Sequence, residues 1–159
     1  MTTQQRLHDL FFYQDGNFVR KITIANAKAG AIAGSPQNKG YVQVYVDKKN
    51  FLLHRLVFLF HHGYMPKMID HINGNRLDNQ IENLREATAS QNQQNRKVQH
   101  TNLSGFKGAV YHPKKMKWQG RIHVNKKKVS LGYFNSAEEA HEAYKKAATT
   151  FFGEFARFN

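Results

Sequence analysis

The chain has 159 residues and a formal net charge of +13, from 24 Lys and Arg against 11 Asp and Glu. This length is enough for one ordinary domain or two small ones. No Cys is present, which excludes disulfides and Cys-ligated zinc sites. The longest apolar stretch, Leu56 to Phe60, is far too short to cross a bilayer, and the N-terminus lacks the apolar run of a signal peptide. We therefore expect an intracellular, cytoplasmic protein with no membrane partner.

The positive charge is concentrated in the C-terminal part of the chain. Residues 1–92 carry 11 basic and 7 acidic side chains, whereas residues 93–159 carry 13 basic and 4 acidic ones. Lys and Arg that neutralise phosphates release condensed counterions, so this imbalance favours a nucleic-acid partner. A surface that only confers solubility is the alternative interpretation. A membrane-surface helix is disfavoured, because the Lys clusters lie in strand-and-turn sequence.

The first forty-six residues predict a small sheet. Residues 5–14 indicate a short helix or the start of a strand, closed by a turn at Asp15-Gly16. Residues 18–24 indicate a strand, residues 25–39 a loop of small and turn-forming residues, and residues 41–46 an alternating strand.

A short buried helix is expected next, followed by two strands and a second helix. Residues 53–62 (LHRLVFLFHH) are apolar on nearly all sides, and Gly63 supplies a C-terminal stop. Short strands are predicted at 68–72 and 83–87, with an Asn-rich turn between them. The second helix is expected to end near Lys97, with its N-cap at one of two hydroxyl residues, Thr88 or Ser90.

The C-terminal part predicts three strands and one helix after a linker at residues 98–105. The strands are expected at 106–111, 117–124 and 128–133. Ser136 followed by Glu139 is the pattern of a capping box, and it opens a clearly amphipathic helix.

The stretch from Tyr64 to Leu84 (YMPKMIDHINGNRLDNQIENL) contains residues that suit phosphodiester hydrolysis. Such a reaction needs a base near neutral pKa, which His71 can supply, and a divalent cation held by oxygen ligands such as Asp70 or an Asn amide. The alternative is that Asp70 caps a turn, His71 packs against the buried helix, and the Asn residues only form the loop. Spacing alone favours that alternative.

The wider stretch DHINGNRLDNQIENLREATASQNQQNR, after LLHRLVFLFHHGYMP, resembles an HNH endonuclease of the homing type in which Asn replaces the last His. Asp70 and His71 match the Asp-His pair, Asn83 the middle Asn, and Asn92 the final metal ligand. The resemblance implies a ββα-metal fold around one divalent ion, Mg²⁺ or else Mn²⁺ or another divalent cation.

The resemblance also implies a role for each matching residue. His71 is expected to be the general base, Asp70 and Asn92 the metal ligands, and Asn83 the residue that orients His71 through a hydrogen bond. Plain structural roles for Asn83 and Asn92 are the alternatives. The remaining loop amides are interpreted as turn formers: Asn73, Asn75 and Asn79.

Residues 104–159 resemble an AP2 DNA-binding domain, with anchors that include Trp118 and the run Leu131-Gly132-Tyr133-Phe134. The resemblance implies a three-stranded sheet in the major groove of DNA and a helix packed behind it. By alternation we expect Val110, Ile122, Val124, Leu131 and Phe134 to face the helix. The expected DNA-binding residues are Lys107, Tyr111, Lys117, Trp118, Gln119, Arg121, His123 and Lys128. Trp118 suits either face, and each exposed Lys can equally be a solvated charge.

Together these features predict an α+β protein with a nuclease domain at 1–97, a linker at 98–105 and an AP2-like DNA-binding domain at 106–159. We expect a site-specific, homing-type endonuclease that hydrolyses phosphodiester bonds in double-stranded DNA with one divalent ion. One active site per chain predicts nicking of one strand by a monomer, or a double-strand break by a dimer on DNA. The alternative is a DNA-binding regulator whose HNH core is inactive. Phage-encoded homing enzymes share this pairing, and such a protein would act in the host cytoplasm.

Overall fold

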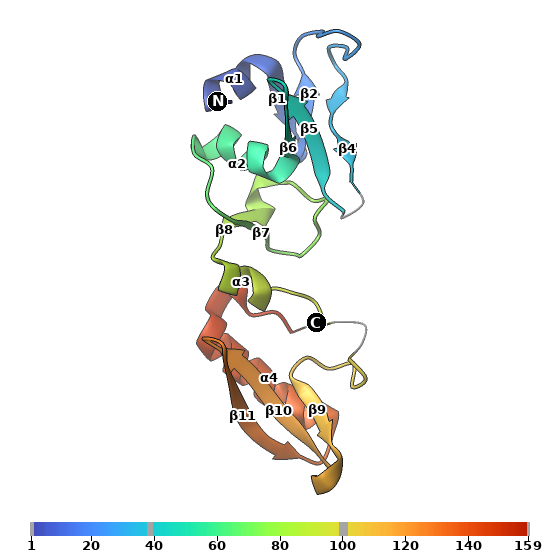
Figure 1. The fold of residues 1–159 in the computed structure, drawn as a ribbon, viewed down its shortest axis with the longest axis vertical. Helices are drawn as coiled ribbons and strands as arrows, with labels where there is room; N and C mark the ends of the chain where they lie inside the picture. The colour runs from blue at the N-terminus through green and yellow to red at the C-terminus, as the bar shows by residue number, and fades with distance from the viewer. Residues whose placement is uncertain (1, 38–39, 99–101, 159) are drawn as a thin grey trace. The chain divides into compact units, whose positions relative to one another are not determined.

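The computed structural model describes residues 2–37, 40–98 and 102–158. The chain forms two compact units, Met1–Thr88 and Ala89–Asn159, so the division falls after Thr88 and before the predicted linker. Of that linker, residues 99–101 lie outside the described residues. Both units mix helix with antiparallel sheet, as expected for an α+β protein (Figure 1).

The first unit contains three small sheets and two helices. The order within the sheets is β1-β2-β3, β4-β5-β6 and β7-β8. The elements are α1 (Gln4–Leu10), β1 (Phe11–Gln14), β2 (Asn17–Arg20), β3 (Ile32–Ala33), β4 (Ser35–Pro36), β5 (Val42–Val46), β6 (Lys49–Leu52), α2 (Leu53–His62), β7 (Ile69–His71), η1 (Ile81–Asn83) and β8 (Leu84–Glu86). The stretch 25–39, predicted to be loop only, holds β3 and β4, because short pairings with β2 and β5 satisfy its backbone.

The helix α2 is the centre of this unit. Its buried side chains, with those of α1, β1, β2 and β5, form one apolar core. Gly63 ends the helix in the left-handed conformation, with φ of 77°, and its N–H bonds the carbonyl of Leu59 at 2.9 Å. The predicted buried helix and its stop are therefore confirmed, and α2 provides a rigid floor beside β7.

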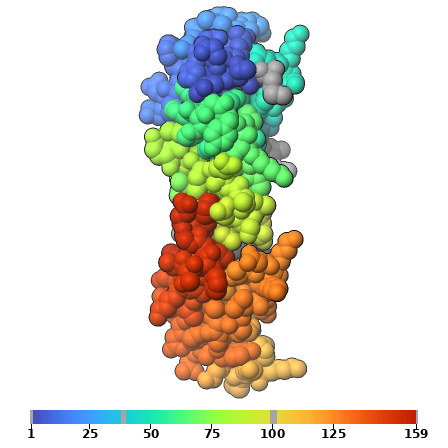
Figure 2. All heavy atoms as spheres, turned by 90° about the vertical axis from the view of Figure 1, so that its left-hand side faces the viewer, coloured from blue at the N-terminus to red at the C-terminus, as the bar shows by residue number. Residues whose placement is uncertain are grey.

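The second unit packs one long helix on a three-stranded sheet of order β11-β10-β9 (Figure 1). Its elements are α3 (Ala89–Gln94), β9 (Ala109–His112), η2 (Pro113–Lys115), β10 (Lys117–Val124), β11 (Lys127–Phe134), α4 (Ala137–Phe152) and η3 (Gly153–Phe155). Figure 2 shows this unit with all heavy atoms, the end of α4 in red and the strands in orange. The small residues Ala140 and Ala148 are fully buried, which lets α4 approach the sheet closely.

Two predicted helix boundaries differ from the structure. α3 ends at Gln94 instead of near Lys97. At the start of α4, the Ser136 hydroxyl accepts from the N–H of Glu139 at 3.1 Å, as a capping box requires. The Glu139 carboxylate, however, accepts from the N–H of Asn135 at 3.0 Å, one residue before the N-cap.

Candidate active site

The strand pair β7–β8 places the predicted acid and base side by side in the interior. Ile69, Asp70 and His71 are all buried, and the register sets Asp70 opposite Arg85 and His71 opposite Leu84. Burial of two polar residues in succession on a short strand requires partners on both faces of that strand. The structure provides a different partner for each of them.

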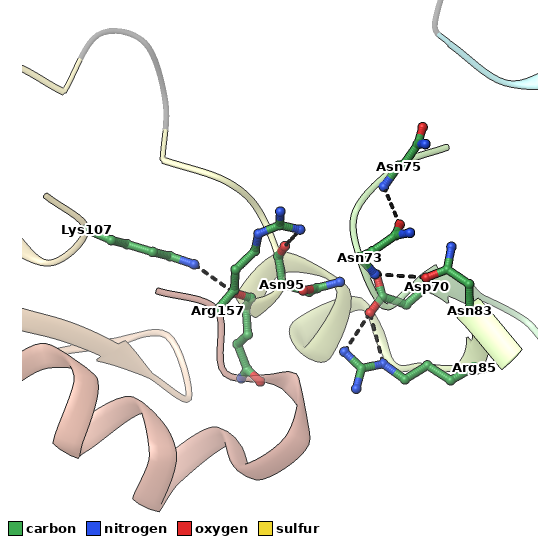
Figure 3. Close-up of polar contacts among 9 residues, drawn as sticks. Asp70, Asn73, Asn75, Asn83, Arg85, Asn95, Lys107 and Arg157 are labelled. Carbon is green, nitrogen blue, oxygen red and sulfur yellow. Dashed lines mark hydrogen bonds and ion pairs between the residues drawn. The ribbon is translucent and has the colours of Figure 1, made fainter. Parts of the chain in front are cut away.

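Asp70 is paired with Arg85, a residue that the sequence analysis did not single out. Arg85 donates from Nε and from Nη2 to the same carboxylate oxygen, Oδ2, at 3.1 and 2.9 Å (Figure 3). Both side chains are well shielded from solvent, with 12% of Arg85 and 5% of Asp70 exposed. The pair compensates the buried negative charge of Asp70 and fixes the position of its carboxylate.

His71 lies in a pocket of rings on the other side. Its ring centroid is 5.1 Å from that of His54 on α2 and 6.2 Å from that of Tyr41. Burial lowers the pKa of His71 below its ordinary value, although the hydrogen bond to Asn79 and the charge of Asp70 oppose this effect. Burial also lowers the pKa of His54 to about 3, so its ring stays neutral beside His71. His54 is therefore a packing residue, as expected.

The residue that orients His71 is Asn79, and the prediction that Asn83 does so is wrong. Asn79 is 2% exposed, and its Oδ1 lies 3.3 Å from Nε2 of His71. Its amide nitrogen donates to the carbonyl of Leu77 at 3.0 Å, which fixes the oxygen toward His71. His71 Nε2 must therefore be the donor in this bond, so Nε2 carries the proton and Nδ1 carries the lone pair. Asn79 was interpreted from sequence as a turn former only.

Asn83 instead ties the loop together. It lies in the 3-10 helix η1, not in the predicted strand, and its Oδ1 accepts from the N–H of Asn73 at 2.9 Å (Figure 3). Its amide nitrogen donates to the carbonyl of Asp78 at 2.8 Å. Asn73 and Asn75 accept from backbone N–H groups two residues on, at 2.7 and 3.2 Å, so both are turn formers as expected.

The N-terminal hairpin braces the same loop. The hydroxyl of Tyr13 on β1 donates to the carbonyl of Asn79 at 3.3 Å and accepts from the N–H of Ile81 at 2.9 Å. A Cβ at Gly16, in the hairpin turn, would meet the backbone of Gln80 at 2.9 Å, so the turn lies directly against the loop. The N-terminal segment therefore supports the residue that orients His71.

Only two of the expected cation ligands can be assigned an environment. Asp70 is buried in the first unit, while Asn92 lies half-buried on α3 of the second unit. Across the described ranges, no group of three or more His, Cys, Asp or Glu side chains could hold a metal ion. A carboxylate and an amide oxygen are nevertheless the donors that suit Mg²⁺, which keeps several waters and takes one or two carboxylates. The donor types therefore fit the expected ion.

The sheet of the second unit has one face away from α4, and its residues differ from those predicted. Along β10, Gly120 and Ile122 are buried against α4, so the alternate residues lie on the outer face: Lys117, Gln119, Arg121 and His123. Lys128 is the cross-strand partner of His123. Trp118 packs with Ala109 and Ala140 on the helix side.

Two predicted face assignments on β9 are wrong. The register pairs Val110 with Gln119 and Tyr111 with Trp118, which places Val110 on the outer face and Tyr111 on the helix side. The rings of Tyr111 and Trp118 lie 5.3 Å apart. A shift of one residue reverses every side chain of a strand, and the sequence pattern did not show which residue of β9 opposes Gly120.

Lys107 does not lie on the outer face either. It precedes β9, and its ammonium group donates to the carbonyls of Gln94 and Arg96 at 2.9 and 2.7 Å. These carbonyls follow the end of α3, where a cation is favourable. Burial lowers the pKa of Lys107 to about 8. Lys107 therefore joins α3 to the sheet.

The outer face also gains aromatic residues. Tyr133 is the partner of Gln119 on β11, and its ring lies 5.5 Å from that of His112. The ammonium group of Lys115 lies 3.8 Å from the centroid of the Tyr133 ring. Tyr133 stood in the sequence only as a family anchor, and the register is the signal that places it here.

Comparison with known proteins defines the class of the first site. Residues 51–94, which include Asp70, His71, Asn79 and Asn83, match the HNH endonuclease family, so the chain contains an HNH nuclease domain. The chain is also 31% identical to Protein 3.8 of Escherichia phage T7 over 122 residues, covering 76% of this chain and 98% of that protein. The chain belongs to the same family as T7 Protein 3.8. No solved structure matches it significantly.

No described helix has the length and apolar character needed to cross a membrane.

Proposed function

We propose that this protein is a homing-type, site-specific endonuclease that nicks double-stranded DNA with one divalent ion. The observation that carries the proposal is the arrangement of His71 and Asn79 on a buried strand inside the matched HNH region. A histidine that merely packs in a core needs no fixed tautomer, whereas a general base needs a defined lone pair. Asn79 holds the proton on Nε2 and leaves Nδ1 as the basic atom.

His71 would accept a proton from the attacking water at Nδ1, and Asn79 would keep the ring oriented during that transfer. Asp70, held by Arg85, and Asn92 would bind the ion. A bound Mg²⁺ would stabilise the negative charge that develops on the phosphate and on the leaving oxygen. Asn83 would keep the loop closed through its bonds to Asn73 and Asp78.

We infer that the second unit is an AP2-like reader of DNA sequence. Support comes from its three-stranded antiparallel sheet, its single long helix on one face, and the basic and amide residues on the other. Gln119 and Arg121 are suited to base edges, whereas Lys117 and Lys128 are suited to phosphates. We also propose that each active site cuts one strand, because each chain has one such site.

The nuclease proposal is tested with His71→Ala. We expect the cleavage rate to fall roughly 100- to 10,000-fold, the usual effect of losing a general base, while DNA affinity stays unchanged. Rates are measured on plasmid DNA and affinities by fluorescence anisotropy of labelled duplex. Cleavage near the wild-type rate would reject His71 as the base.

A further inference from the structure

The Arg85–Asp70 pair has an unusual form for a guanidinium and a carboxylate. An Arg fork commonly bonds both oxygens of a carboxylate, one nitrogen to each. Here Nε and Nη2 both donate to Oδ2, because Arg85 lies directly across the strand pair from Asp70. Both side chains are shielded from water, so the arrangement is fixed by protein contacts.

This geometry makes the two carboxylate oxygens of Asp70 unequal. A carboxylate oxygen has about two lone-pair sites, and the two guanidinium bonds occupy both sites on Oδ2. A cation that binds Asp70 while Arg85 stays in place must therefore use Oδ1. Binding through both oxygens at once would require the loss of at least one of these charge-assisted bonds.

Divalent ions differ in what they require from a carboxylate. Mg²⁺ is octahedral and accepts one oxygen from each carboxylate, with water and phosphate completing its shell. Ca²⁺ takes six to eight oxygen ligands, often with a carboxylate bound through both oxygens. The denticity of Asp70 matters here, because the described residues hold no cluster of acidic or His side chains that could compensate for it.

We infer that Arg85 is a positioning residue that restricts Asp70 to one oxygen and thereby selects Mg²⁺-like ions over Ca²⁺. This inference rests on the proposed role of Asp70 as a metal ligand. The selection requires the planar fork of Arg, since a Lys ammonium is a point donor that cannot place two bonds on Oδ2 in the same way. Arg85→Lys therefore keeps the charge and removes the restriction.

The test is competitive ion binding to the full-length protein, followed by the electron paramagnetic resonance signal of free Mn²⁺. Mg²⁺ and Ca²⁺ are each titrated against bound Mn²⁺ in wild type, Arg85→Lys and Arg85→Gln. Asp70→Asn defines which part of the Mn²⁺ binding belongs to this site. Arg55→Lys is the matched control, because Arg55 lies in the same unit and donates to the carbonyls of Pro66 and Lys67.

In wild type and in Arg55→Lys we expect Mg²⁺ to displace Mn²⁺ at lower concentration than Ca²⁺ does. In Arg85→Lys we expect this Mg²⁺-over-Ca²⁺ preference to fall by roughly tenfold, the equivalent of one hydrogen bond to a charged group. Arg85→Gln should shift the preference in the same direction, and it serves if the Lys variant does not fold. An unchanged preference in a folded Arg85 variant would overturn the inference alone. Wild type without Asp70-dependent Mn²⁺ binding would overturn the metal role of Asp70 and the inference with it.

Discussion

The side-chain amide of Asn79 determines which ring nitrogen of His71 is basic. Replacing Asn79 with Leu keeps the approximate volume and removes the acceptor for Nε2. We expect the cleavage rate to fall roughly 10- to 100-fold with DNA affinity unchanged, the usual effect of losing a residue that orients a functional side chain. Asn75→Leu is the control, because Asn75 bonds only within the exposed loop. Equal losses in both variants would show that the loop fold matters and the tautomer does not.

His54 makes the stability of the first unit depend on pH. Its pKa is about 3 in the folded protein and about 6.5 when unfolded, so only the unfolded chain takes up the proton between these values. The stabilisation is complete above pH 6.5 and is lost as the pH falls toward 3. Relative to pH 7, the loss at pH 5 is about 2 kcal/mol.

The measurement is urea unfolding of wild type and His54→Gln at pH 7 and pH 5. We expect the stability difference between the two proteins to shrink by about 2 kcal/mol at the lower pH, because the variant has no proton to take up at this position. Comparing the two proteins removes the contribution of all other titrating groups. The same difference at both pH values would contradict the assignment.

Close approach of α4 to the sheet depends on the glycine before β9. Gly108 has φ of 81°, and a Cβ there would lie 2.3 Å from a ring atom of Tyr144. Gly105 has a similar φ of 70° but open space around it. Each Ala substitution should cost about 1 kcal/mol for the left-handed backbone. Gly108→Ala should cost about 1–3 kcal/mol more, because it overfills the contact with Tyr144.

Urea unfolding of both variants measures this difference directly. Equal costs at the two positions would show that Tyr144 moves aside easily, and that the helix does not need close approach at this point.

Elements with strong local signals could be predicted from sequence, while their register could not. The apolar run ending at Gly63 and the capping pattern at Ser136 each define a helix within a few residues of chain. The face that Tyr111 occupies depends instead on which residue of β9 opposes Gly120, and that pairing is set by packing against α4. Arg85 and Asn79 were missed for the same reason, because their partners lie 15 and 8 residues away in sequence.

The charge of the second unit should act through one face of its sheet. Lys117 and Lys128 lie on the strands, whereas Lys145 and Lys146 lie on α4. Lys117→Gln/Lys128→Gln should lower the slope of log affinity against log salt by about 2, one for each lost phosphate contact. Lys145→Gln/Lys146→Gln removes the same net charge and should leave the slope nearly unchanged.

Anisotropy titrations with labelled duplex over a range of salt concentrations give both slopes. Equal effects of the two double variants would show that the basic charge acts as a diffuse field, without a defined DNA-binding face.

Cleavage of supercoiled plasmid that carries DNA from the protein's own source tests the central claim most directly. The assay compares wild type and His71→Ala, each with Mg²⁺ and with EDTA. We predict that wild type produces nicked circles first, only with Mg²⁺, and that His71→Ala binds the DNA but produces almost none. Linear product in one encounter at limiting enzyme would contradict nicking by a monomer. Tight binding without cleavage under any divalent ion would instead identify a DNA-binding regulator with an inactive nuclease core.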